Sequence, residues 1–158
     1  MIQQAGIIKE LQPLPQQSKA NASLLARWLH YQRNKKLRRW LLEKVSFPLP
    51  YPILEINPGT LNNGSHPNQS FQLVYGINAH SSWQHPTREF ARICQWLQPG
   101  GRLVLVFRPR HIKNQRDLAN LARLTHYQLQ KAGFHNIVVE LRQLKPGMGI
   151  YVEGTTAP

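Results

Sequence analysis

The junction between a helix and a strand in the middle of the chain constrains the fold more than any other feature. Residues 86–97 place apolar side chains at helical spacing, a Pro-Gly-Gly turn follows, and residues 102–107 read Arg-Leu-Val-Leu-Val-Phe. Consecutive apolar residues are typical of a strand that is buried on both faces, as in a parallel sheet. The junction therefore predicts an α/β fold with a largely parallel sheet.

The rest of the chain supplies further elements of such a layer. Apolar segments bounded by turn residues predict a helix at 117–132 and strands at 53–56, 71–77, 137–144 and 148–153. The last two strands flank a Lys-Pro-Gly turn, which indicates an antiparallel hairpin. Only residues 57–70 connect the first two strands, and so short a connection barely allows a parallel crossover.

The N-terminal part differs in composition from this core. Residues 1–20 are rich in Gln and Pro and are expected to form a tail, which can include a short edge strand at 6–11. Residues 21–45 predict a long helix, because the prolines that follow them forbid its continuation. We therefore expect a tail followed by a single domain at 21–158, with a basic helix at 21–47 and an α/β core at 53–156.

Charge and cysteine content limit the partners of the chain. Twenty Lys and Arg residues face seven Asp and Glu residues, and the net charge of +13 attracts polyanions and acidic proteins. The single cysteine, Cys94, excludes an intrachain disulfide, and its helical phase indicates core packing. The histidines show no metal-ligand spacing, so no metal site is expected. No transmembrane segment and no secretory signal are visible, so we expect a cytoplasmic location.

Lys and Arg residues cluster in two short segments. The first lies on the N-terminal helix and contains Arg33, Lys35, Lys36, Arg38 and Arg39. The second follows the strand at 102–107 and contains Arg108, Arg110, Lys113 and Arg116. A solvated helix face normally mixes charges, whereas Glu43 is the only acid within residues 21–45. The pattern favours contact with nucleic acid or an acidic protein partner. An interfacial membrane helix and a solvated face are the alternatives.

Four segments resemble the class I S-adenosylmethionine-dependent methyltransferases (type 11-like). Residues 53–60, Ile-Leu-Glu-Ile-Asn-Pro-Gly-Thr, resemble the first motif of that family, and residues 71–75 resemble its fourth strand. Residues 96–105, with Leu-Gln-Pro-Gly-Gly before an apolar strand, resemble the end of a helix and the fifth strand. Residues 131–134 resemble the turn into the last hairpin. The resemblance covers residues 50–156 and implies a Rossmann-like methyltransferase fold.

The sequence departs from this family where the cofactor would bind. Residues 57–61 lack the first and last glycines of the family's loop. No Asp or Glu occurs between Glu55 and Glu89, although an acidic residue about 20 positions past such a loop normally holds the ribose hydroxyls. Residues 61–70 leave no room for the family's second and third strands. We therefore expect a reduced fold without these two strands, with a parallel sheet, a C-terminal antiparallel hairpin and an N-terminal helix.

The resemblance also implies roles for single residues, each of which has a simpler interpretation. Glu55, Asn57 and Gly59 would bind the cofactor, but they also suit a capped turn. Asn78 and His80 follow the second predicted strand, where the family places catalytic groups and where α/β sheets bind ligands. His80 could act as a base, or both could be ordinary loop residues. No cofactor is expected, or S-adenosylmethionine if the protein is active.

Three functions remain open. The first is a degenerate methyltransferase-like protein without methyl transfer that binds nucleic acid or a partner protein. The second is an active methyltransferase whose cofactor pocket is completed by a partner or a second subunit. The third is a structural protein whose charge only maintains solubility. The missing strands would leave the strand at 53–56 at an open edge, which the N-terminal segment, the basic helix or a second copy in a homodimer would cover.

Overall fold

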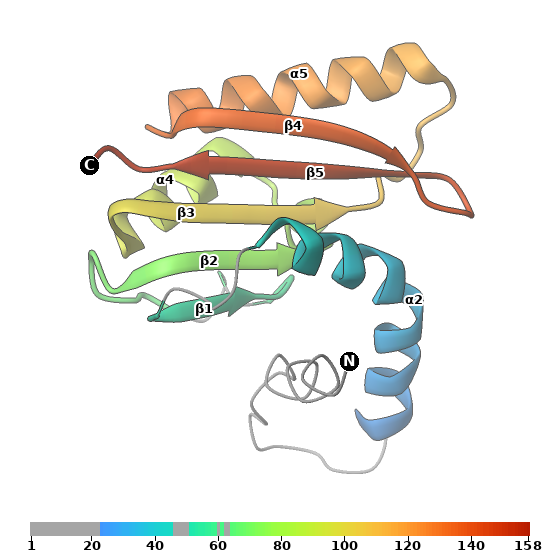
Figure 1. Ribbon diagram of the computed structural model, residues 1–158, viewed down its shortest axis with the longest axis horizontal. Helices are drawn as coiled ribbons and strands as arrows, with labels where there is room; N and C mark the ends of the chain where they lie inside the picture. Colours follow the sequence, from blue (N-terminus) through green and yellow to red (C-terminus); the bar gives the residue numbers. More distant parts are fainter. Residues whose placement is uncertain (1–22, 46–50, 60, 62–63) are drawn as a thin grey trace. The chain divides into compact units, whose positions relative to one another are not determined.

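The computed structural model describes residues 23–45, 51–59, 61 and 64–158, and side chains from Asn34 onward except that of Ser81. Residues 34–158 form one compact unit. The elements in chain order are α2 (Ser23–Lys44), β1 (Ile53–Ile56), β2 (Phe71–Ile77), the 3-10 helix η1 (Ala79–Ser82), α4 (Pro86–Trp96), β3 (Leu97–Phe107), α5 (Gln115–Lys131), β4 (His135–Gln143) and β5 (Met148–Thr155) (Figure 1). The expected tail at 1–20, its strand at 6–11 and the helix end at 46–47 lie outside the described residues.

The strands form one mixed sheet of five in the order β1-β2-β3-β5-β4. β1, β2 and β3 are parallel, with Leu54 opposite Val74 and Val74 opposite Leu103. β5 runs antiparallel to both β3 and β4, with Leu105 opposite Val152. The predicted α/β layer with a C-terminal antiparallel hairpin is confirmed. The short connection at 57–70 does join two parallel strands.

β3 begins earlier than the sequence predicted. Strand pairing with β2 already starts at Leu97 and is interrupted by a register shift before Arg102. The expected Pro-Gly-Gly turn is therefore a bulge inside an 11-residue strand, and the helix before it stops at Trp96. The turn was predicted because Pro and Gly favour turns locally. Gly100 does have a left-handed backbone, with φ +70°, but Leu97 before the bulge and Arg102 after it both pair with β2.

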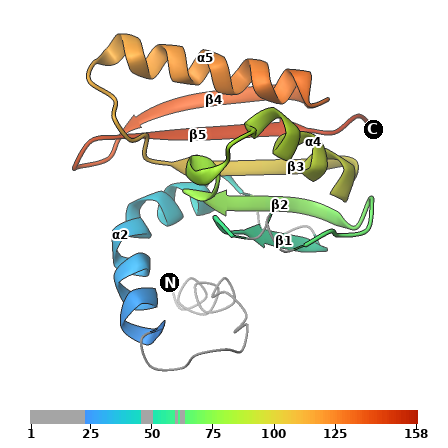
Figure 2. The same ribbon diagram turned by 180° about the vertical axis from the view of Figure 1, so that it is seen from behind.

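α4 and α5 cover one face of the sheet, which lies toward the viewer in Figure 2. Alternate side chains of β3 point into this layer, and Phe90 and Ile93 of α4 are fully buried there. Asn114 begins α5, because its Oδ1 accepts a hydrogen bond from Asp117 N. Gly133 ends it with φ +98°, as predicted for a left-handed cap. Cys94 is partly buried, which raises the pKa of its thiol.

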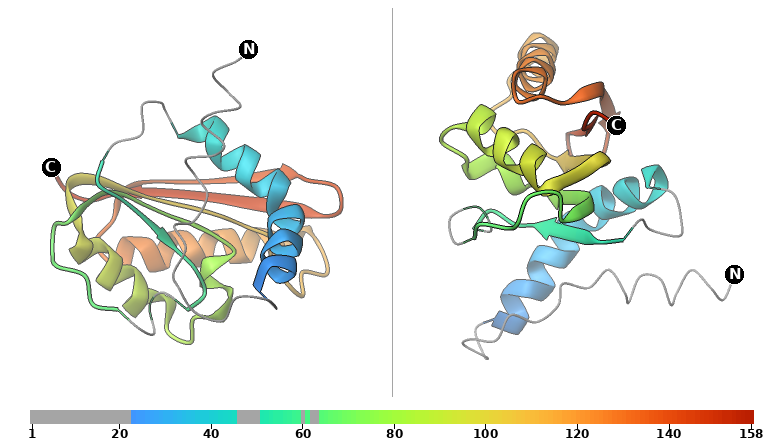
Figure 3. Two further views of the ribbon diagram at one scale, coloured as in Figure 1. Left: turned by 90° about the horizontal axis from the view of Figure 1, so that it is seen from below. Right: turned by 90° about the vertical axis from the view of Figure 1, so that its left-hand side faces the viewer.

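The second half of α2 covers the other face of the sheet (Figure 3, left). Its apolar side chains are buried, and the Trp40 ring lies 5.9 Å from the ring of Tyr151. Gly149 lies under this indole: a Cβ there would stand 3.0 Å from Cζ3 of Trp40 and 2.6 Å from Cδ1 of Leu144. An ion pair joins Lys44, the last residue of α2, to Glu140 of β4, with 2.5 Å between Nζ and Oε1. Among the described helices, none is long and apolar enough to cross a membrane.

Candidate anion-binding edge of the sheet

β1, β2 and β3 all end at the same edge of the sheet, the carboxyl edge, to which their arrows point in Figure 1. Open α/β sheets bind ligands beyond this edge. The segments that leave the three strands carry the sequence candidates Glu55, Asn57, Asn78, His80 and Arg108. The fold therefore brings residues from three separate parts of the sequence to one place.

The carboxylate of Glu55 is held by other side chains of the chain. The Tyr75 hydroxyl donates a hydrogen bond to Glu55 Oε2 at 3.0 Å, and Arg38 Nη2 lies 3.9 Å from Oε1. Burial, and then the charge of Glu55 and this hydrogen bond, raises the pKa of Tyr75, so the hydroxyl remains a donor. Both partners of the ion pair are largely buried, at 13% and 16% side-chain exposure. Asn57 and Gly59 are exposed beyond the strand.

Asn78 joins three elements at the carboxyl edge. Its Nδ2 donates to Asn34 Oδ1 of α2 at 2.8 Å, and its Oδ1 accepts from the backbone N of Arg108 at 2.9 Å. Its own backbone N donates to the carbonyl of Val106 at 2.9 Å. The left-handed backbone of Asn78, with φ 55°, is a conformation that Asn adopts more readily than most residues. The side chain of Asn78, which the sequence offered either as a catalytic candidate or as an ordinary loop residue, thus connects α2 with β3 and its loop.

The ring of His80 is mostly covered by aromatic side chains. Its ring packs 3.9 Å from the ring of Phe107 and 5.9 Å from that of Trp83. Burial lowers the pKa of His80 to about 4, because the charged imidazolium would lose its hydration. Among the described residues, no group hydrogen-bonds its Nδ1. A neutral imidazole with this pKa is a weak base at neutral pH.

The cations predicted on the N-terminal helix separate into two groups. Lys35, Lys36 and Arg39 are exposed, whereas Arg38 points inward to Glu55. The Nζ of Lys36 donates to the backbone carbonyl of Lys145, at the turn between β4 and β5. The side chain of Arg33 lies outside the described part of the chain. This face of α2 therefore reaches the hairpin turn.

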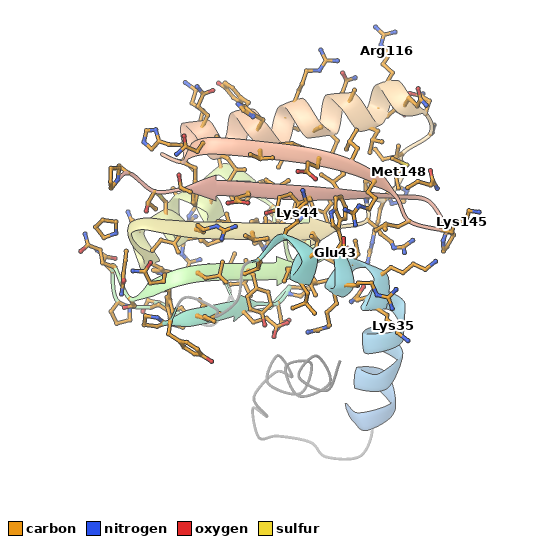
Figure 4. All side chains as sticks on the ribbon, in the orientation of Figure 1. Lys35, Glu43, Lys44, Arg116, Lys145 and Met148 are labelled. Atoms are coloured by element: carbon orange, nitrogen blue, oxygen red, sulfur yellow. The ribbon has the colours of Figure 1, made fainter. Side chains whose placement is uncertain are left out.

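The loop after β3 reaches the same turn from the other side. The guanidinium of Arg108 donates to the carbonyls of Leu144, at 3.2 Å, and of Pro146. Arg110, Lys113 and Arg116 are exposed on this loop and at the start of α5. Figure 4 shows Lys35, Arg116 and Lys145 at one end of the sheet. The two basic segments thus flank a single hairpin turn, although 69 positions separate Arg39, the last cation of the first segment, from Arg108, the first cation of the second.

Carboxylates are sparse in this region. Of the Lys and Arg side chains that the structure describes, those within 4.0 Å of a carboxylate are Arg38, Lys44, Arg92, Arg102 and Arg142. The cations without such a partner are concentrated at the carboxyl edge, and we call this set the basic edge: Lys35, Lys36, Arg39, Arg108, Arg110, Lys113, Arg116 and Lys145. Mutual repulsion makes the basic edge a favourable place for an anion.

Sequence reasoning missed two members of this region. Lys145 was assigned only to a turn, and its exposure at the tip of a hairpin was the available signal. Asn34 gave no signal, since its hydrogen bond to Asn78 spans 44 positions. Among the described residues, no group of three His, Cys, Asp or Glu side chains could hold a metal ion.

Comparison with known proteins identifies the fold. No family model matches the sequence, and no curated protein matches it in sequence. A methyltransferase of Thermotoga maritima, described as S-adenosylmethionine-dependent and a possible histamine N-methyltransferase, has a TM-score of 0.58 and 15% identity. That alignment covers 84% of this chain and 95% of that chain.

Two further structures align over shorter lengths. An S-adenosylmethionine-dependent methyltransferase of Mesorhizobium loti has a TM-score of 0.45 and 18% identity, over 61% of this chain and 67% of that chain. A possible exported protein of Bordetella parapertussis has a TM-score of 0.41 and 17% identity, over 60% of this chain. This chain spans only 41% of the length of the Bordetella protein.

This chain is structurally similar to class I S-adenosylmethionine-dependent methyltransferases, with a sheet shortened to five strands. The resemblance predicted from the sequence is confirmed for the fold. At 15% identity the similarity concerns the fold alone.

Proposed function

We propose that this chain is a degenerate methyltransferase-like protein, without methyl-transfer activity, that binds nucleic acid through its basic edge. The observation that carries the first half of this proposal is the position of α2. Asn34 bonds to Asn78 after β2, and Arg38 lies beside Glu55 of β1. Since ligands of open α/β sheets bind at these strand ends, the chain's own helix lies in the place of a ligand.

The residues at the carboxyl edge do not suit S-adenosylmethionine. The carboxylate of Glu55 is engaged by Tyr75 and Arg38, and no other Asp or Glu follows before Glu89 to hold ribose hydroxyls. We also infer that the family's second and third strands are missing. β1 is the outermost described strand on its side of the sheet, and only residues 57–70 join it to β2. The adenosine half of a cofactor pocket would then have no wall.

The basic edge supports the second half of the proposal. Nucleic acid binding is driven by cations that replace condensed counterions at phosphates, and it needs no catalytic group. The basic edge supplies such cations on exposed loops and a helix, with few carboxylates among them. No base-reading motif accompanies them in the sequence, so we propose binding that is insensitive to base sequence.

Calorimetry with S-adenosylmethionine and S-adenosylhomocysteine tests the first half. We expect the purified full chain to bind both ligands weakly or not at all. Glu55→Ala and the control Glu89→Ala should then behave as the parent protein does. Micromolar binding that only Glu55→Ala removes would contradict the proposal. That result would favour the active methyltransferase whose pocket a partner or second subunit completes.

Fluorescence anisotropy with a labelled oligonucleotide at several salt concentrations tests the second half. The affinity should fall with salt, with a logarithmic slope of about −0.7 to −0.9 per neutralised phosphate. The triple variant Lys35→Glu, Lys36→Glu and Arg39→Glu should lose most of the affinity. The matched control reverses three exposed cations outside the basic edge, namely Arg88, Arg123 and Lys131. Equal affinities of the two variants would contradict nucleic acid binding by these three cations. The remaining explanations of the charge would then be an acidic protein partner or a solvated helix face.

The outer edge of β1 is a second surface for which we propose a partner. β1 is only four residues long and pairs on one side, with β2, in the described sheet. Unpaired strand edges tend to recruit another strand. We propose that a second copy of the chain pairs here in a homodimer. Light scattering during size exclusion should give a dimer mass that Leu54→Pro reduces to that of a monomer.

A further inference from the structure

Resting on the proposed function, we infer that the nucleic acid is a duplex whose two backbones lie on opposite sides of the hairpin turn 144–148. The turn projects between two hollows, and cations line both. A duplex carries two parallel lines of phosphates with a groove between them, which is the pattern that this surface complements.

The first hollow lies between the turn and the loop that follows β3. It has a volume of about 370 Å³, and Arg108 and Lys113 contribute its cations. Pro146 and Met148 form its wall on the side of the turn. Arg110 and Arg116 are exposed on the same loop and at the start of α5, so they extend the positive charge beyond the hollow.

The second hollow lies between the turn and α2. It has a volume of about 380 Å³ and is lined by Lys36, Arg39, Arg142 and Lys145. One carboxylate is present, that of Glu43, and Arg142 neutralises it at 2.5 Å. The two hollows therefore carry the same sign of charge, with the turn between them.

The turn is fixed from both sides by the cations that flank it. Arg108 donates to the carbonyls of Leu144 and Pro146, and Lys36 donates to that of Lys145. Within the turn, Leu144 N donates to the Gly147 carbonyl at 2.9 Å. Such bracing holds an exposed tip in one position, and in Figure 4 Lys145 and Met148 lie at the far end of the sheet. A fixed ridge suits a groove better than a flexible chain.

The described side chains argue against a single strand. Single-strand binders stack bases on exposed aromatic rings, at about 1–3 kcal/mol per base. Among the Phe, Tyr and Trp residues that the structure describes, the exposed ones are Tyr51 and Tyr127, at 76% and 54%, and neither lines a hollow. At the tip, Pro146 and Met148 are of the type that enters a minor groove as an apolar wedge.

Anisotropy with a labelled duplex and with each of its strands alone tests this inference, in DNA and in RNA. We expect the duplex to bind more tightly than either strand. On the duplex, Arg39→Ala with Lys145→Ala and, separately, Arg110→Ala with Lys113→Ala should each reduce the salt slope by about 2, one for each lost phosphate contact. Arg88→Ala with Arg123→Ala is the control and should leave the slope unchanged. Thermal melting of every variant checks folding.

The outcomes separate this inference from the function on which it rests. Equal or tighter binding of the single strands, with the same sensitivity to both pairs, overturns the duplex and retains a nucleic-acid-binding protein. Sensitivity of the duplex to one pair only overturns the two-sided arrangement. If neither form binds in low salt, the proposed function itself is wrong.

Discussion

The face of the sheet under α4 and α5 and the carboxyl edge under α2 are built from different kinds of residue. Under α4 and α5 the buried side chains are apolar, as with Phe90, Leu103 and Leu105, all at most 1% exposed. At the carboxyl edge, the buried Asn34 of α2 bonds to Asn78 after β2, and the largely buried Arg38 pairs with Glu55 of β1. The layer under α4 and α5 needs only apolar side chains of the right volume. The carboxyl edge needs polar side chains that are paired with one another.

This difference shows that the layer that supports the sheet and the contacts at its carboxyl edge depend on separate residues of the chain. The apolar layer supports the sheet shared with the Thermotoga protein. The carboxyl edge contains polar contacts between side chains of the chain itself. Residues at that edge can change without loss of the layer beneath.

The largest effect is expected in the apolar layer. Phe90→Ala should lower the free energy of unfolding by about 3–5 kcal/mol, because it leaves a cavity among fully buried side chains. Leu124→Ala, on the half-exposed outer side of α5, is the control and should cost about 1 kcal/mol or less. Urea denaturation measures both. Similar losses for the two variants would mean that α4 is not packed as described.

Acid should destabilise the region around His80. The pKa of His80 is about 4 in the folded chain and near 6.5 when unfolded, so the unfolded state binds the proton first. The contribution of neutral His80 to the free energy of unfolding is therefore fully present above pH 6.5. It is lost as the pH falls toward 4, by up to about 3 kcal/mol. His80→Phe should reduce this decline, whereas His135→Phe, at an exposed position, should not. Urea denaturation at a series of pH values measures this decline in the free energy of unfolding. An unchanged decline in His80→Phe would contradict the burial of the His80 ring.

Asn78→Ala should break the connection between α2 and the loop after β3. Loss of the two hydrogen bonds, to Asn34 and to Arg108 N, should cost about 2 kcal/mol. Asn136→Ala is a matched control, because Asn136 is exposed and also has a positive φ, of 49°, and its Nδ2 donates a hydrogen bond to Thr155 Oγ1. Hydrogen exchange should rise in residues 34–45 of the Asn78 variant alone. Equal hydrogen exchange in both variants would mean that Asn78 does not hold α2 in position.

The smallest effect concerns Glu43. Glu43→Gln removes an exposed ion pair with Arg142 and should change stability by less than about 1 kcal/mol. It also removes the carboxylate from the second hollow, so nucleic acid should bind more tightly. Glu140→Gln breaks the half-buried pair with Lys44 outside that hollow and should leave the affinity unchanged. Anisotropy of the two variants at one salt concentration measures the difference.

Features with a local signal could be predicted from the sequence. The apolar residues of 102–107 indicated a strand buried on both faces, and Lys-Pro-Gly at 145–147 indicated a hairpin. Gly133 was recognised as a helix cap because only a few residue types adopt a left-handed backbone there. The first residues of β3 were missed, since their pairing depends on β2, which lies far away in the sequence.

The candidate site depended on contacts that no local pattern encodes. Both basic segments were identified, but nothing in them showed that Lys36 would meet Lys145, 109 positions away. Arg38 was grouped with its basic neighbours, although its helical phase directs it toward Glu55. His80 followed a strand end, as a catalytic residue would, yet the turn of η1 buries it against Phe107. Side-chain direction in these cases is decided by tertiary packing.

The close approach of Trp40 to Gly149 has a consequence for how this sequence can diverge. A methyl group at position 149 would collide with the indole and with Leu144, so no larger residue fits while both neighbours keep their size. Gly149 can be substituted by a larger residue only after residue 40 or residue 144 has become smaller. Trp40, Leu144 and Gly149 should therefore vary together, with residue 40 or residue 144 becoming smaller before the glycine is replaced.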